Sequence, residues 1–302
     1  MKTFNIKKIL VPTDFSQTAG NALDQAIQIA KVNKASIKLL HVITPVYVTT
    51  SNSLIAGGGD AFYRKLKSNA SDELKKMAKQ IKKISNVVVD YKAKFGAVDD
   101  VICSMAEQEK FDIIVMGTHG TSGVKEFFAG SNAYKVVNHS DCPVLTIQKK
   151  GGKQGLKNIV LPIRLEITSR QKVDYAIQIA RMFDSTIFIA GYTDDKNKSK
   201  QFKVKQYVAQ VEKYLDKQNI KYKSICIFAD NFTKEILTHA KKNKADLIMV
   251  MKKHDFSLDQ VVKGAYSEQF VNHSTIPVLS VPVYTNPDML THGTYLLGDV
   301  PF

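Results

Sequence analysis

Short apolar runs alternate with amphipathic stretches along the first half of the chain. A run such as Ile-Ile-Val-Met at residues 113–116 is typical of a strand buried in a parallel sheet. The other stretches place apolar residues three or four positions apart, as on one face of a helix. We predict strands at residues 8–12, 36–42, 87–92, 112–117 and 143–148. We predict helices around residues 23–30, 74–81 and 98–105, and a fourth that begins at Ser131.

The second half of the chain repeats this order. The sequence Ala-Ile-Gln-Ile-Ala at residues 26–30 recurs unchanged 150 residues later, and Val-Asn-His-Ser at residues 137–140 recurs 134 residues later. The first copy is therefore longer by 16 residues, which we place in the Thr-, Ser- and Gly-rich residues 44–60 and interpret as an inserted surface loop. The second copy has predicted strands at residues 158–163, 186–192, 221–228, 246–251 and 277–281.

The alternation predicts an α/β protein with two tandem doubly wound, Rossmann-like domains. Each domain is expected to be a five-stranded parallel sheet with helices on both faces. We place the domains at residues 1–150 and 151–284, and a C-terminal tail at residues 285–302 lies outside the repeat.

A glycine-containing segment follows the fourth predicted strand. Residues 115–120 read Val-Met-Gly-Thr-His-Gly, and Gly130-Ser131 stands before the fourth predicted helix. Glycine lets the backbone pass close to a ligand, and the free N–H groups of a helix start, which Ser131 can cap, attract anions. Such glycines are also ordinary in turns, but the longer spacing Gly-x2-Gly-x9-Gly-Ser favours a phosphate site. It is neither a Walker P-loop nor the contiguous dinucleotide fingerprint.

Ligands of open parallel sheets bind beyond the carboxyl ends of the strands, where the strand order reverses. This rule selects Pro12-Thr13-Asp14 after the first strand, His41-Val42 after the second and Met116-Gly117 after the fourth. We expect these places to meet Gly130-Ser131 around one crevice.

These motifs resemble the universal stress protein family in its tandem form. The resemblance rests on residues 10–16, 116–120, 130–131 and 142–145 and extends over about residues 1–284. It implies that Asp14 binds the base and ribose side of ATP and that the main chain at Val42 contacts the adenine edge. It also implies that the phosphates bind with Mg²⁺ or Mn²⁺. The implied nucleotide-binding residues are Pro12, Thr13, Asp14, Val42, Met116, Gly117, His119, Gly120, Gly130 and Ser131.

The second copy departs from this pattern. Arg164 stands for Asp14, Met251 for Gly117, His254 for Gly120 and Ala265 for Ser131, and only Gly264 retains the glycine at position 130. We expect these bulky side chains to fill the crevice, so that the chain has one nucleotide site, in the first domain. A weaker alternative is that the basic residues of the second copy bind another anion.

The motifs favour an ATP-binding regulatory protein of the stress response. No catalytic set of residues and no metal-ligand spacing is recognisable, because Asp14 is the only carboxylate that we place at the crevice. The alternatives are a weak ATPase and a protein-interaction module that works without nucleotide. A homodimer and unknown protein partners are compatible with the sequence.

Composition narrows the class of protein. The formal charge of +15 invites a nucleic-acid hypothesis, but five lysines of residues 75–83 lie opposite an apolar face, which is typical of a solvated helix. Nucleic acid is therefore not an expected partner. No apolar run is long enough to span a membrane and no signal peptide is recognisable, so we expect a cytoplasmic protein whose three cysteines are buried free thiols.

Overall fold

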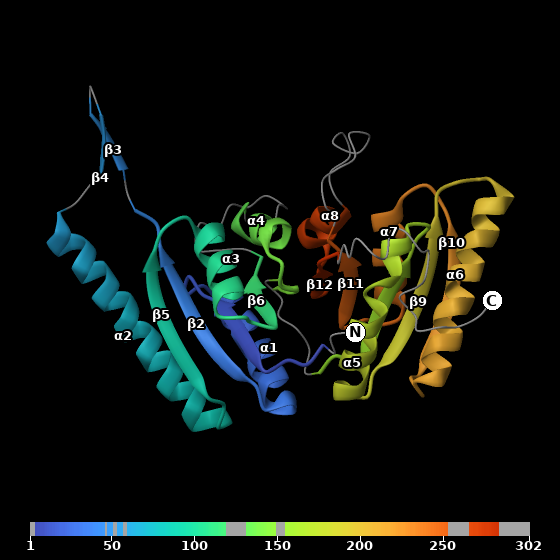
Figure 1. The fold of residues 1–302 in the computed structure, drawn as a ribbon, viewed down its shortest axis with the longest axis horizontal. Coiled ribbons are helices and arrows are strands. Elements are labelled where there is room, and N and C mark those ends of the chain that lie inside the picture. The colour runs from blue at the N-terminus through green and yellow to red at the C-terminus, as the bar shows by residue number, and fades with distance from the viewer. Residues whose placement is uncertain are drawn as a thin grey trace. The chain divides into compact units, whose positions relative to one another are not determined.

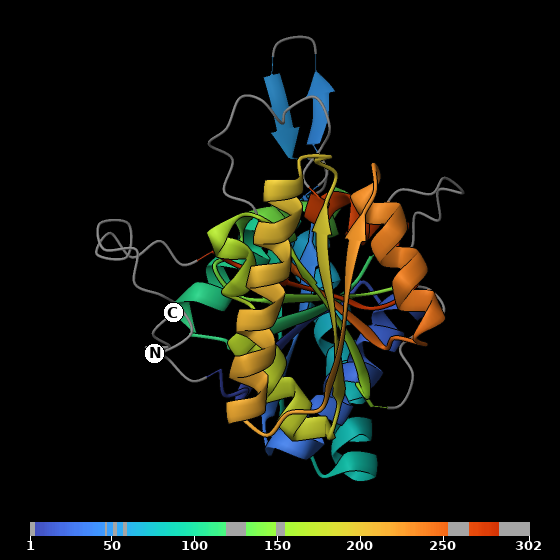
Figure 2. The same ribbon diagram turned by 90° about the vertical axis from the view of Figure 1, so that its right-hand side faces the viewer.

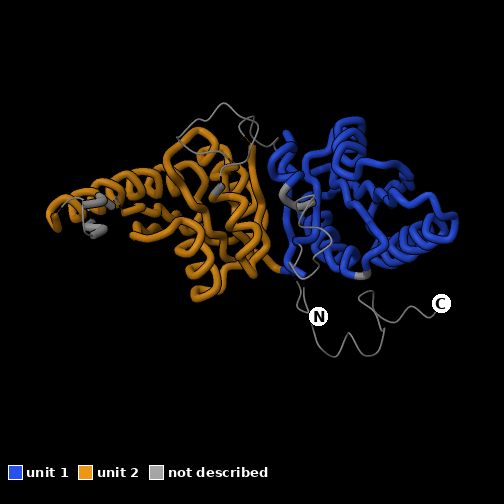
Figure 3. Tube along the Cα trace, turned by 90° about the horizontal axis from the view of Figure 1, so that it is seen from above, with its two compact units in different colours: residues 1–4, 152–302 blue, residues 5–151 orange. Residues whose placement is uncertain are grey.

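The computed structural model describes residues 4–45, 47–50, 53–56, 59–118, 131–148, 155–252 and 266–283. The chain divides into two compact units, residues 5–151 and residues 152–302, the latter joined by residues 1–4 (Figure 3). We call them the N-terminal and C-terminal domains.

The N-terminal domain has five parallel strands in the order β5-β2-β1-β6-β7. They are β1 (Lys8–Pro12), β2 (Ser36–Ile43), β5 (Val89–Phe95), β6 (Ile113–Gly117) and β7 (Val144–Ile147). Its helices are α1 (Gln17–Asn33), α2 (Asp60–Ser85), α3 (Val98–Gln108) and α4 (Ser131–His139). Helices α1 and α2 contact each other over one face of the strands, and α3 packs with α4 (Figure 1).

The C-terminal domain repeats this arrangement, with the parallel order β10-β9-β8-β11-β12. Its strands are β8 (Asn158–Ile163), β9 (Thr186–Thr193), β10 (Tyr222–Phe228), β11 (Leu247–Met251) and β12 (Val278–Val281). Its helices are α5 (Val173–Phe183), α6 (Lys198–Lys217), α7 (Phe232–Lys242) and α8 (Tyr266–His273), with a short 3₁₀ helix, η1 (Ile167–Arg170). In Figure 2 the gold α6 and the orange α7 lie on opposite sides of the strands.

The predicted α/β fold is confirmed. In each domain the central strands are buried along almost their whole length, as the burial of β1, β6, β8 and β11 shows. Such strands must be apolar on both faces, because helices cover both. This is why they read as continuous apolar runs in the sequence and not as alternating ones.

Residues 44–60 contain a feature that the sequence analysis did not predict. Strands β3 (Tyr47–Thr50) and β4 (Ser53–Ala56) pair antiparallel within this insertion. The interpretation as a loop without strands was therefore wrong for these residues. The sequence Tyr-Val-Thr-Thr at β3 is rich in aromatic and β-branched residues, which favour strands, and we had given more weight to the neighbouring glycines.

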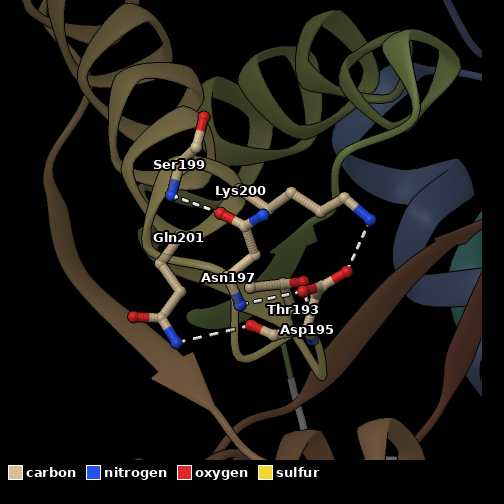
Figure 4. A network of polar contacts seen from close by, with 6 residues as sticks. All are labelled: Thr193, Asp195, Asn197, Ser199, Lys200 and Gln201. Atoms are coloured by element: carbon tan, nitrogen blue, oxygen red, sulfur yellow. Dashed lines mark hydrogen bonds and ion pairs between the residues drawn. The ribbon is translucent and has the colours of Figure 1, made fainter.

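The C-terminal domain connects β9 to α6 by residues 194–197 only. A network of hydrogen bonds and one ion pair joins the residues of this connection to the first turn of α6 (Figure 4). The N–H of Asn197 donates to Asp195 Oδ1 at 2.8 Å, and Asn197 Oδ1 accepts the N–H of Ser199 at 2.8 Å as the N-cap of α6. The ammonium nitrogen Nζ of Lys200 lies 2.5 Å from Asp195 Oδ2, so the two side chains form an ion pair. The network satisfies helix-start groups that would otherwise lack partners.

The lysine face of α2 is solvated, as the sequence predicts. All five lysines of residues 75–83 are exposed, while Leu74, Ala78 and Ile81 on the other side are buried. In the part of the chain that the structure describes, no helix is long and apolar enough to cross a membrane.

Candidate functional site

The strand order of the N-terminal domain brings the predicted site segments to one edge. Strand β1 lies between β2 and β6, and the three run parallel, so their carboxyl ends point the same way. The connections from β1 lead to β2 on one side and later to β6 on the other, so the order reverses at β1. Residues Thr13, Val42 and Gly117 therefore lie at the same edge, where open α/β sheets bind ligands.

A tight turn after β1 holds Asp14. Its carboxylate Oδ1 accepts the N–H of Ser16 at 3.0 Å, and Thr13 Oγ1 accepts the N–H of Phe15 at 3.1 Å. Ser16 is then the N-cap of α1, because its hydroxyl oxygen accepts the N–H of Ala19 at 3.2 Å. The side chain of Asp14 is thus positioned by the backbone at the start of a helix.

Phe15 adopts an unusual backbone conformation in this turn. Its φ of 64° lies in the left-handed region, which is uncommon for an aromatic residue. Its ring is 41% exposed and stacks on His41, with 4.6 Å between ring centroids. His41 Nδ1 in turn lies 2.8 Å from the carbonyl oxygen of Thr13. The turn after β1 and the end of β2 therefore support each other, a pairing that the sequence analysis did not anticipate.

Gly117 ends β6 in direct contact with α1. A β carbon at Gly117 would lie 2.9 Å from Thr18 Cγ2 and 3.0 Å from the Thr18 backbone carbon. Such distances are too short for any side chain, so this position requires glycine for the packing of the strand end on the helix. The next residue, Thr118, is buried and its N–H donates to the carbonyl oxygen of Ile147 at 3.0 Å. This bond continues the sheet past the end of β6.

Some of the other predicted site residues lie in the described part of the structure, and others do not. The side chains of Pro12 and Met116 are buried, so only their backbones can face this edge, and Val42 is half-buried. Helix α4 is described from Ser131 onward. His119, Gly120 and Gly130 lie outside the described residues.

The same edge of the C-terminal domain is built differently. Met251 occupies the position of Gly117, and the chain opposite it forms η1 where the N-terminal domain has the first turn of α1. Helix α5 begins only at Val173. Strand β11, which ends at Met251, contacts η1, so the two differences from the N-terminal domain lie at the same place.

The second domain nevertheless keeps a cavity at this edge. A cavity of about 90 Å³ lies among residues that include Arg164, Ser169 and Met251. We expected the bulky residues of the second copy to fill the crevice. Met251 lines this cavity and does not fill it, while His254 lies outside the described residues.

The described residues hold no group of three or more His, Cys, Asp or Glu side chains that could bind a metal ion. The three cysteines are free thiols, but only Cys142 is buried, and Cys103 and Cys226 are half-buried. The thiol of Cys142 donates to the carbonyl oxygen of Phe111 at 3.3 Å, and burial raises its pKa. Our expectation of buried thiols therefore holds for one cysteine of the three.

These features define a tandem α/β protein. The universal stress protein family matches the chain twice, at residues 5–148 and 155–282, and the chain belongs to this family. Universal stress protein MJ0577 of Methanocaldococcus jannaschii is 35% identical over 160 residues, which are 48% of this chain and 96% of that protein. Universal stress protein YxiE of Bacillus subtilis is 32% identical over 145 residues, which are 47% of this chain and 98% of that protein.

Among solved structures, a universal stress protein from Archaeoglobus fulgidus is similar over nearly the whole length. The similarity covers 93% of this chain and 99% of that one, with a TM-score of 0.72 and 18% sequence identity. At this identity the likeness supports the fold of both domains and carries no information about the ligand.

Proposed function

We propose that this protein is an ATP-binding regulatory protein of the stress response, with one nucleotide site at the carboxyl edge of the N-terminal domain. The observation that carries the proposal is the position of Asp14, whose carboxylate accepts the N–H of Ser16 at the start of α1, at the edge where β1, β2 and β6 end together. A carboxylate held at this edge can accept hydrogen bonds from ribose hydroxyl groups, and the neighbouring helix start can attract phosphates.

The contrast between the domains supports a single site. Asp14 can accept hydrogen bonds from ribose hydroxyl groups, whereas Arg164 in its place cannot. Met251 places a side chain where Gly117 has none. The C-terminal domain then serves as a structural and regulatory partner of the N-terminal domain.

We expect a divalent cation to bind together with the nucleotide. Because the described residues form no metal-binding group, Mg²⁺ or Mn²⁺ would arrive on the phosphates and take most of its ligands from phosphate oxygens and water. The chain's own residues would position the ribose and the phosphates.

Binding, and not turnover, is the proposed activity. Phosphoryl transfer to water needs a group that orients the attacking water. Asp14 is held in the turn by the N–H of Ser16 and lies, by the family resemblance, on the ribose side. Rapid ATP hydrolysis that Asp14→Ala abolishes would make the protein an enzyme and overturn this part of the proposal.

The test is calorimetric titration of nucleotide-stripped protein with ATP and with GTP, in the presence of Mg²⁺. A Gly120→His variant carries the residue of the second copy at that position and serves as the blocked site. We expect ATP to bind the wild type and not the variant, with weaker binding of GTP. Absence of binding to both proteins would favour the alternative of an interaction module that works without nucleotide.

A further inference from the structure

The cavity of the C-terminal domain contains an unusual concentration of positive charge. Three cationic residues line it, Arg164 after β8, Lys172 before α5 and Lys252 after β11. The only acidic residue among the lining residues is Glu166, whose carboxylate lies 3.2 Å from the guanidinium of Arg164. The described lining therefore has an excess of cationic groups over carboxylates.

None of these cations has a counterpart in the N-terminal domain. By the repeat, Arg164 stands where the first copy has Asp14, Lys172 where it has Ala22, and Lys252 where it has Thr118. Three substitutions at separate places in the sequence thus bring positive charge to one cavity. A degenerating copy would lose residues at this edge, but random loss does not explain this convergence.

Lys172 is the most informative of the three. Its side chain is 2% exposed, and its ammonium group donates to the carbonyl oxygen of Ser169 and lies 3.4 Å from Ser169 Oγ. It forms no ion pair with a carboxylate of the described residues. A buried ammonium that forms no ion pair is costly. Burial lowers the pKa of Lys172 to about 7; the carboxylate of Glu166 opposes this shift, and the charge of Arg164 adds to it.

The remaining lining is mostly apolar. Phe232, Met249 and Met251 face the cavity with Pro162, and the guanidinium of Arg164 lies 4.9 Å from the ring centroid of Phe232. Phe232 also belongs to the aromatic core formed with Tyr192 and Phe270. An apolar cavity with a few convergent polar groups is the usual form of a small-molecule site.

We propose that this cavity binds a small organic molecule through one phosphate or carboxylate group, held by Arg164, Lys172 and Lys252. The oxyanion supplies the negative charge that Lys172 lacks, and the apolar part of the ligand lies against Phe232 and Met249. The volume of the cavity, about 90 Å³, is that of several water molecules and suits a small head group with a short apolar part. The second domain is then a separate ligand-binding domain and not a lost copy of the first.

The test uses the full chain with two probes, inorganic phosphate and propionate, which represent the two head groups. Binding is followed by phosphorus line broadening for phosphate and by saturation-transfer NMR for propionate, at about pH 6.5, where Lys172 is largely protonated. We expect at least one probe to bind, and its affinity to fall about tenfold or more in Lys172→Met. Arg164→Gln should weaken the same binding. Lys213→Met, which removes an exposed lysine of α6, is the matched control and should leave it unchanged.

The variant Lys172→Met is chosen so that a loss of binding can be attributed to the missing ammonium group. Methionine retains most of the volume of Lys172 and removes a buried charge, so we expect the variant to fold, which circular dichroism will verify. A phosphate site in the N-terminal domain would also bind phosphate, but Lys172→Met would not affect it. The proposal is overturned if neither probe binds the wild type, or if binding is equal in the wild type and in Lys172→Met.

A pH series with propionate adds a second readout, because its carboxylate stays ionised from about pH 6 to about pH 9. Among the described residues, the charged groups that line the cavity with Lys172 are Arg164, Glu166 and Lys252. We expect propionate to bind the wild type more weakly as Lys172 loses its proton, and the residual binding of Lys172→Met to be independent of pH over this range. An equal pH dependence in both proteins would exclude Lys172 as the binding cation.

Discussion

Gly117 and Thr18 meet at the point where β6 ends and α1 begins, with 2.9 Å between the place of a Gly117 β carbon and Thr18 Cγ2. The equivalent pair in the second domain is Met251 and Thr168, and there the helix start is replaced by η1. The two domains thus differ at this pair of positions. Helix α1 begins with a regular turn beside Gly117, whereas the chain beside Met251 forms η1. The stability and binding properties of the two domains should follow from this difference.

Gly117→Ala should destabilise the protein. The added methyl group would press on the side chain and backbone of Thr18, and overpacking of this kind costs about 1–3 kcal/mol. Gly20→Ala is the control on the same helix, since nothing lies within 4 Å of its added β carbon. It should be neutral or stabilising by up to about 1 kcal/mol, because alanine favours helices. Urea denaturation measures both, and equal effects of the two variants would contradict the role of the Gly117 contact.

Ser16→Ala should affect both stability and nucleotide binding. The loss of the N-cap of α1 costs about 1 kcal/mol. The backbone N–H that binds Asp14 remains in alanine, but the helix start that carries this N–H becomes less firmly fixed. Asn197→Ala removes the N-cap of α6 in the other domain and should cost about the same. We expect weaker ATP binding only for Ser16→Ala, as measured by calorimetry beside urea denaturation. A similar loss of ATP affinity in Asn197→Ala would show that the effect is one of general stability.

Lys172 should make stability depend on pH. Its pKa in the folded protein, about 7, lies below the ordinary value of 10.5, so between these values the unfolded chain binds more protons than the folded one. The free energy of unfolding should therefore rise with pH from about 7 towards about 10.5, by up to about 1.4 kcal/mol per pH unit from this group. Below pH 7 the lysine is protonated in both states, and its contribution no longer changes.

The matched comparison for this prediction is Lys172→Met. The variant should lack the rise with pH, so the difference in unfolding free energy between variant and wild type should shrink as the pH increases. Urea denaturation at several pH values measures this difference. A constant difference would show that Lys172 does not titrate in this range.

Much of the fold could be predicted from the sequence, because buried parallel strands and one-sided helices leave strong local patterns. Strand β5 begins two residues and ends three residues after its predicted bounds, and the other nine predicted strands begin and end within one residue of theirs. The repeat of residues 26–30 at 176–180 reveals the second domain. The antiparallel pair β3–β4 was missed, since the Thr, Ser and Gly content of residues 44–60 indicated a loop more strongly than two four-residue strands indicated a sheet.

The site was less predictable than the fold. The sequence predicted that the segments of Asp14 and Gly117 lie at one edge of the sheet, and they do, because the carboxyl ends of β1, β2 and β6 meet there. The contact of Phe15 with His41 depends on a left-handed backbone conformation that no sequence pattern indicates. The burial of Lys172 depends on the change from a regular helix start to η1, and this change results from tertiary packing.

The central claim, one ATP site per chain in the N-terminal domain, is tested most directly by the stoichiometry of ATP binding in Asp14→Arg. This variant carries the residue of the second copy at that position, and Asp24→Arg makes the same charge change at an exposed position of α1. Calorimetry with Mg²⁺ should give a stoichiometry near one for the wild type and for Asp24→Arg, and no binding for Asp14→Arg. A stoichiometry near two, or undiminished binding to Asp14→Arg, would contradict the account.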